Sequence, residues 1–159
     1  MTAPLRLRRL ALAWLALLLV CGAGWYTRPD TWRPHTQSEL LTHTVFAYRQ
    51  WQSTGFYLDQ GDRFTLTARG EWLYSPLVGR HGPAGGRPAP AFYPLPNVAG
   101  GALIGRVGED GQPFYVGRRS THFASAPGLL YLRINDDLLG DNEGQLAVEI
   151  EITPSSESQ

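Results

Sequence analysis

An acidic segment near the C-terminus carries the residues best suited to chemistry. It runs over residues 135–144 and contains four carboxylates, those of Asp136, Asp137, Asp141 and Glu143. Two unit charges 4 Å apart repel by about 1 kcal/mol in water and about 4 kcal/mol at an effective dielectric constant of 20, so converging carboxylates favour a bound cation. Hard oxygen ligands of this kind are typical of calcium sites. The spacing is not that of an EF-hand, so a second loop has to complete any site.

The same segment also suits a turn without a ligand. Asn, Asp and Gly are favoured in turns by backbone geometry alone, and a run of charges is often a hydrated surface. The residues by themselves leave both alternatives open.

Catalytic motifs are absent from the sequence. A nucleophile such as Ser120 or Ser125 would need His43, His81 or His122 as its base, and these histidines are scattered, with no Gly-x-Ser-x-Gly motif. Glycosidase chemistry would need two residues of the acidic segment, but a metal ligand cannot also be a free general acid. We therefore predict a binding domain and not an enzyme.

Composition narrows the class of partner. The 159 residues suffice for one globular domain. The 14 basic residues are all Arg and are balanced by 14 acids, which disfavours nucleic acid as a partner. The one cysteine, Cys21, lies in the N-terminal apolar run, so a disulfide or a thiolate zinc site is excluded.

Strands must position the acidic segment. Apolar and polar residues alternate with a period of two over residues 64–69, 130–134 and 146–152. Further strands are predicted at 45–51, 55–58, 71–74, 102–107, 114–116 and 120–123. Because no convincing helix separates them, the pattern predicts an all-β fold, an antiparallel β-sandwich or jelly roll.

Proline and glycine interrupt this pattern over residues 75–100, which are predicted to form one long structured loop. Gly100 and Gly101 open a strand and lack the Lys-Ser/Thr ending of a phosphate loop. They predict a close crossing of strands.

The N-terminus predicts a hydrophobic helix that acts as an export or anchoring signal. Three arginines precede an uncharged run over residues 10–20, and the less apolar extension to residue 26 makes about 26 Å of helix, barely enough to cross a bilayer. Trp25 and Tyr26 favour a retained anchor over cleavage after Ala23, and lipidation of Cys21 is a third alternative. The positive-inside rule predicts a domain outside the bacterial cytoplasmic membrane, either anchored to it or secreted into the periplasm.

The predicted organisation therefore has four segments. Residues 1–26 are a signal anchor or signal peptide, 27–44 an extended linker, 45–153 the β-sandwich and 154–159 a disordered tail.

Four blocks of this sequence, taken in order, resemble the PA-I galactophilic lectin-like family. The blocks are residues 70–74, 82–85, 101–108 and 134–144, and the resemblance covers residues 54–152. The family consists of bacterial β-sandwich domains with a galactose-binding-domain-like architecture, which bind galactose through calcium. The resemblance thus implies a calcium-dependent carbohydrate-binding domain, with a galactoside or another glycan as ligand.

The resemblance also implies which residues bind the metal. They are the side chains of Asp136, Asp141 and Asn142 and the backbone carbonyl of Tyr74. Two departures affect the site. The loop between Asp136 and Asp141 is shorter than the family's, and the family's sugar-gripping His and Gln have no counterpart in residues 88–93.

Four further residues are predicted to contact the ligand: His81, Phe92, Tyr93 and Asp137. The two aromatic residues either stack on a sugar ring or pack their loop onto the sandwich. An alternative function is a structural or protein-interaction module in which calcium only stabilises the loops. An open coordination position on the metal distinguishes the lectin from this module.

Overall fold

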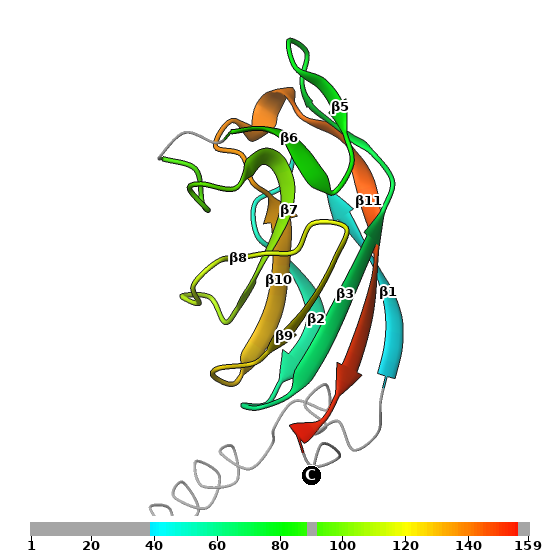
Figure 1. Cartoon of the computed structure of the whole chain (residues 1–159), viewed down its shortest axis with the longest axis vertical. Coiled ribbons are helices and arrows are strands. Elements are labelled where there is room, and N and C mark those ends of the chain that lie inside the picture. Colours follow the sequence, from blue (N-terminus) through cyan, green and yellow to red (C-terminus); the bar gives the residue numbers. More distant parts are fainter. Residues whose placement is uncertain (1–38, 89–91, 156–159) are drawn as a thin grey trace, which may run out of the picture. The chain divides into compact units, whose positions relative to one another are not determined.

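The computed structural model describes residues 39–88 and 92–155 (Figure 1). The chain divides into two compact units, Met1–Arg33 and Pro34–Gln159, and the account below concerns the second. The predicted signal anchor and N-terminal hydrophobic helix lie outside the described residues. Within the described ranges, no helix is long and apolar enough to span a bilayer.

The described chain is almost entirely β-structure, in two antiparallel sheets. The first sheet has six strands: β5 (Gly79–His81), β4 (Trp72–Ser75), β11 (Glu143–Thr153), β3 (Arg63–Arg69) and β9 (Arg119–Phe123) in spatial order, with β1 (Glu39–Phe46) paired to β11. The longest strand, β11, has β1 along one edge and β3 along the other. At its first residues β11 pairs with β4, through Glu143 opposite Leu73.

The second sheet faces the first (Figure 1). It has five strands: β2 (Gln52–Leu58), β10 (Gly128–Ile134), β7 (Ala99–Val107) and β6 (Ala84–Pro88) in spatial order, with β8 (Phe114–Tyr115) paired to β7. A short 3-10 helix, η1 (Leu139–Asp141), lies in the segment that leads from β10 to β11.

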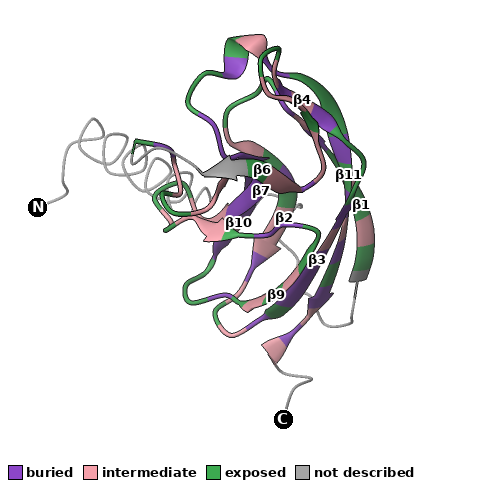
Figure 2. Cartoon of the chain, turned by 45° about the horizontal axis from the view of Figure 1, so that its top comes forward, coloured by how far each residue is buried: buried purple, intermediate pink, exposed green. Residues whose placement is uncertain are grey.

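The alternating pattern predicted from the sequence explains the core between the sheets. In β11 every second residue is fully buried, while Ala147 and Glu151 between them face solvent. The buried side chains of β11 are Leu146, Val148, Ile150 and Ile152, and they meet Phe64 and Leu66 of β3 and Leu130, Leu132 and Ile134 of β10 (Figure 2). The prediction of an all-β, antiparallel fold is confirmed.

Several predicted boundaries were wrong. The linker was expected to reach residue 44, but β1 begins at Glu39, because Leu41 and His43 already turn inward between exposed Thr42 and Thr44. The strand expected over 45–51 ends at Phe46, and a turn leads to β2 at Gln52.

The predicted long loop over residues 75–100 was also wrong, because it contains β5 and β6 and the start of β7. β5 and β6 are short, and glycine occurs in both and at the start of β7, so this composition gives little periodic signal. The predicted disordered tail begins too early. Pro154 is buried, and the backbone N–H of Ser155 donates to Asp62 Oδ1 at 3.0 Å; residues 156–159 lie outside the described part.

Candidate functional site

One end of the sandwich gathers the predicted site residues. The acidic segment between β10 and β11, the β4–β5 hairpin and the segment leading into β7 meet there, at the top of the view in Figure 1. They enclose an open cavity of about 250 Å³. It is lined by Tyr74, Ser75, Val78, Tyr93, Asp136, Asp137, Leu138 and Asp141. Five of the eight predicted site residues therefore line one cavity.

Asp136 is buried at the base of this cavity, with 3% of its surface exposed. Its Oδ2 accepts a hydrogen bond from Asn142 Nδ2 at 2.8 Å, and its Oδ1 accepts one from the Leu138 N–H at 3.3 Å. Asn142 also donates to the Ala47 carbonyl at 3.4 Å. These hydrogen bonds thus hold the predicted ligands Asp136 and Asn142 in a fixed geometry relative to each other.

Two other oxygen atoms in the segment lack a hydrogen-bond donor among the described residues. They are Asp141 Oδ1 and Asn142 Oδ1, and both are buried. A buried acceptor without a partner costs about 1–3 kcal/mol, and more when the group is charged. Such atoms mark a place where a ligand, an ion or water supplies the missing interaction.

The donor set fits a hard cation. Asp136, Asp141 and Asn142 offer carboxylate and amide oxygens, and Tyr74 lines the same cavity from β4. Within the described ranges, no group of three His, Cys, Asp or Glu side chains gathers as a metal site. Amide and backbone carbonyl oxygens therefore have to complete the coordination, as they commonly do for calcium.

A pair of tyrosines closes the wall beside Asp136. The Tyr74 and Tyr93 hydroxyl oxygens lie 2.5 Å apart, and both side chains are buried. Burial raises the pKa of Tyr93 above its usual range, and hydrogen bonds to Tyr74 and Asp136 add to this effect. Tyr93 therefore stays protonated and offers a neutral hydroxyl at the cavity.

Gly100 and Gly101 allow Tyr74 to lie against β7. A Cβ atom at Gly100 would be 2.6 Å from the Tyr74 hydroxyl oxygen, and one at Gly101 would be 3.1 Å from Cγ of its ring. The predicted close approach at this glycine pair is confirmed.

Three predicted ligand-binding residues differ in their placement. Asp137 is exposed at the mouth of the cavity. Phe92 is 70% exposed and touches Tyr93 edge-on, with ring centroids 5.6 Å apart. The His81 ring lies 6.2 Å from the Tyr74 ring and does not line the cavity, and its buried Nε2 has no partner among the described residues.

Sequence reasoning missed two residues that hold the acidic segment. The Asn135 side chain accepts from the Leu95 N–H at 3.0 Å and donates to the Leu95 and Val98 carbonyls, so it ties the segment before β7 to the site. Arg133 is buried and donates to the carbonyl of Asp136. In the sequence Arg133 looks like an ordinary outward-facing residue of an alternating strand. Its position just before the acidic segment was the one available signal.

The structure brings together one of the catalytic pairs considered above. The Ser120 Oγ lies 2.9 Å from His122 Nε2, because both side chains lie on one face of β9. Burial lowers the pKa of His122, whose ring lies 4.2 Å from that of Phe114. A cavity of about 310 Å³ beside His122 is lined mostly by apolar residues and does not include Ser120. His43 and His81 lie on other strands.

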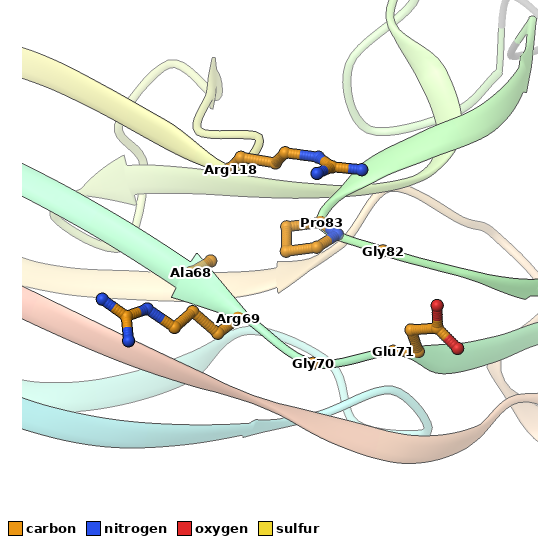
Figure 3. Close-up of a pocket in the computed structure, with 7 residues that line it drawn as sticks. All are labelled: Ala68, Arg69, Gly70, Glu71, Gly82, Pro83 and Arg118. Carbon is orange, nitrogen blue, oxygen red and sulfur yellow. The ribbon is translucent and has the colours of Figure 1, made fainter.

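A separate hollow of about 300 Å³ lies where β3 passes into β4 (Figure 3). Its charged residues, Arg69, Glu71 and Arg118, are all exposed. Figure 3 shows the Arg69 side chain pointing away from Glu71, and the Arg69 Nη2 lies 3.9 Å from the Glu149 carboxylate. Exposed, hydrated charges of this kind do not make a site comparable to the acidic cavity.

Comparison with solved structures identifies the fold. The structure is similar to the N-terminal domain of EclA, a PllA-like lectin, with a TM-score of 0.59 and 23% sequence identity. The match covers 72% of this chain and 98% of that domain. No protein-family model matches the sequence, and neither does any curated protein. The chain thus has a PA-I-like lectin fold, and the resemblance read from the sequence is confirmed at the level of the fold.

Proposed function

We propose that this chain is a non-catalytic, calcium-dependent carbohydrate-binding domain whose site is the acidic cavity. The observation that carries the proposal is the pair of buried oxygens without donors, Asp141 Oδ1 and Asn142 Oδ1, beside that cavity. Similarity of fold to a lectin supports a carbohydrate as the ligand.

Calcium would be held by Asp136, Asp141, Asn142 and the Tyr74 carbonyl. A cation gives the two orphaned oxygens a partner and relieves the repulsion between neighbouring carboxylates. When bound, the metal would take sugar hydroxyls as further ligands.

The walls of the cavity suit a sugar better than a bare ion. The exposed carboxylate of Asp137 and the hydroxyls of Ser75 and Tyr93 offer hydrogen-bonding groups. One large apolar side chain of the lining, Leu138, is 63% exposed, and Leu77, which is 93% exposed, precedes the lining residue Val78 in the chain. Sugars present hydroxyls and apolar C–H faces side by side, so a wall of mixed character is complementary to them.

The identity of the sugar depends on Tyr93. The resemblance places the family's sugar-gripping residues near residues 88–93, and of the two side chains described there, Phe92 and Tyr93, Tyr93 offers a polar group to the cavity. A galactoside or another glycan fits this description, and the Tyr93 hydroxyl would select among them.

We infer that the domain works outside the bacterial cytoplasmic membrane. The inference rests on the arginines and the apolar run at the N-terminus, which are typical of an anchor or export signal. Glycans exposed to the periplasm or the exterior are then the accessible ligands.

The test is a calorimetric titration of the full chain, held in a detergent without a sugar headgroup, so that the detergent does not compete as a ligand. Calcium is titrated first, and a panel of galactosides and other glycans follows, in calcium and in chelator. We expect calcium binding at one site and glycan binding that is lost in chelator. Glu143→Gln is the matched control, since it removes a carboxylate of the same segment that does not line the cavity.

Each outcome of the titration supports or excludes one of the candidate functions. Calcium binding without any glycan response would overturn the lectin proposal in favour of a structural or protein-interaction module. Glycan binding that persists in chelator would overturn the role of the metal. No calcium binding at all would leave only the fold.

A further inference from the structure

Arg133 is a buried cation immediately before the acidic segment, with 5% of its surface exposed. Its Nε donates to the Ile134 carbonyl at 3.0 Å and its Nη2 to the Asp136 carbonyl at 2.5 Å. Its Nη1 donates to Gln50 Oε1 at 2.6 Å, in the turn between β1 and β2. One guanidinium therefore grips the backbone on both sides of Asn135.

The partners of Arg133 are unusual for a buried charge. Among residues 39–88 and 92–155 it forms no ion pair, and its acceptors are two backbone carbonyls and one amide oxygen. The ring of Trp51 lies 5.5 Å from its guanidinium carbon. Burying a charge without a paired carboxylate is costly, and burial lowers the pKa of Arg133. An arginine kept for stability alone gains little in such a place.

The geometry of the guanidinium explains why an arginine occupies this position despite the free-energy cost of burying its charge. Its planar fork holds several acceptors at once, which a lysine ammonium on a flexible stem does not do. The grip falls on the carbonyl of Asp136, whose carboxylate lies in the cavity wall. The charge of Arg133 also attracts the carboxylates of Asp136 and Asp137, so it offsets part of their mutual repulsion before any cation arrives.

We propose that Arg133 is the positioning residue of the acidic cavity, because it fixes the Ile134–Asp136 backbone so that the Asp136 carboxylate is already aimed for cation binding. The inference rests on the proposed calcium site. Groups that orient a metal ligand from behind typically change metal affinity by about 10-fold to 100-fold when they are altered.

Two substitutions in the full chain separate the grip from the charge. Arg133→Lys keeps the charge and loses the fork, while Arg133→Gln loses the charge. We expect both to weaken calcium binding by about 10-fold or more in the calorimetric titration. Gln50→Ala is the matched control, since it removes the side-chain acceptor of the guanidinium and leaves its two backbone acceptors in place, and we expect a change of less than about 3-fold.

Other results would overturn the positioning role. If Arg133→Lys binds calcium like the wild type and Arg133→Gln binds it more tightly, the residue acts only through its charge. If both variants melt at lower temperature but bind calcium with unchanged affinity while folded, the residue only stabilises the fold.

A second measurement in calcium-free protein keeps this inference separate from the proposed function. The side-chain amide of Asn142 donates to Asp136 Oδ2, so its NMR resonances report where that carboxylate points. We expect Arg133→Lys to move them toward the positions of a solvated asparagine. If the wild type binds no calcium but the resonances move, the proposed function fails while the positioning of Asp136 stands. Unmoved resonances would overturn the positioning itself.

Discussion

Two buried acidic sites lie at opposite ends of the sandwich, and only one of them has unsatisfied oxygens. Asp62, just before β3, is 2% exposed. Its Oδ2 accepts from the Asp59 N–H at 2.8 Å and its Oδ1 from the Ser155 N–H at 3.0 Å. Both oxygens of this carboxylate are used, so Asp62 fastens two pieces of backbone.

The acidic segment at the other end is built differently. Asp136 is satisfied in the same way as Asp62, yet the neighbouring Asp141 and Asn142 each keep a buried oxygen without a described donor. Burial of a carboxylate therefore does not by itself separate a structural from a functional role. An acceptor left without a donor beside an open cavity favours a role in ligand binding.

Removing the fully satisfied carboxylate should have the largest effect on stability. Asp62→Ala removes the acceptor of two part-buried N–H groups, and we expect the free energy of unfolding to fall by about 1–3 kcal/mol. Denaturant titration measures this with and without calcium, and the loss should be equal in both. A loss of stability seen only in the presence of calcium would contradict the purely structural role that distinguishes Asp62 from the acidic segment. Asp110→Ala, at an exposed position, should change little.

Removing the charge of Asp141 should lower the calcium affinity without lowering the stability of the calcium-free protein. Asp141→Asn is expected to lower calcium affinity at least 10-fold, about 1.4 kcal/mol, because it removes one negative ligand. Stability in chelator should stay the same or rise, since one carboxylate oxygen of Asp141 is buried without a donor among the described residues. Calorimetry and thermal melting check the two halves of this prediction. Destabilisation in chelator would mean that Asp141 fastens the loop as Asp62 fastens its own end.

Stability should also depend on pH through two histidines outside the acidic segment. Burial lowers the pKa of His43 and of His122 below the ordinary 6.5. As the pH falls, the two histidines are therefore protonated in the unfolded chain before they are protonated in the folded protein. The stability contributed by the neutral rings is complete above pH 6.5 and is lost as the pH falls toward the folded-state pKa. Each ring contributes at most about 1.4 kcal/mol per pH unit.

Denaturation midpoints between pH 7.5 and 5 measure this slope. His43→Leu should flatten it, and Asp141→Asn should not. An unchanged slope in His43→Leu would assign the dependence to other groups.

The smallest effect is expected at Leu77, whose chain neighbour Val78 lines the cavity. Leu77→Ser should leave the free energy of unfolding within about 0.5 kcal/mol of the wild type, because the side chain is 93% exposed. Glycan binding should weaken by a few fold in the titration. Leu40→Ser is the matched control, since Leu40 is 71% exposed on β1 at the other end. Equal glycan binding by the two variants would remove Leu77 from the site.

The sequence was sufficient for the fold where side chains alternate. β3, β10 and β11 were predicted because apolar residues alternate with polar or less apolar ones in their sequences, and the apolar residues of each strand are buried. It failed for β5 and β6, whose residues are mostly glycine, proline and charged or polar residues. Their hydrogen bonds come from pairing with β4 and β7, and such pairing leaves no periodic pattern in the short strand itself.

The candidate site, like the fold, was predicted from the sequence only in part. Asp136, Asp141 and Asn142 were predicted as ligands from the resemblance, and their side chains do lie at one cavity or bond to its wall. Their role in binding calcium stays a prediction. The supporting residues Arg133 and Asn135 were missed, because most of their partners are backbone groups, and a backbone group has no residue type to read in the sequence.

The direction of β11 has one further consequence. This strand starts beside the acidic segment and ends where β1 begins, with Ile152 opposite Glu39. Eleven residues of extended chain span about 35 Å. The polypeptide therefore enters the sandwich a full strand length away from the cavity.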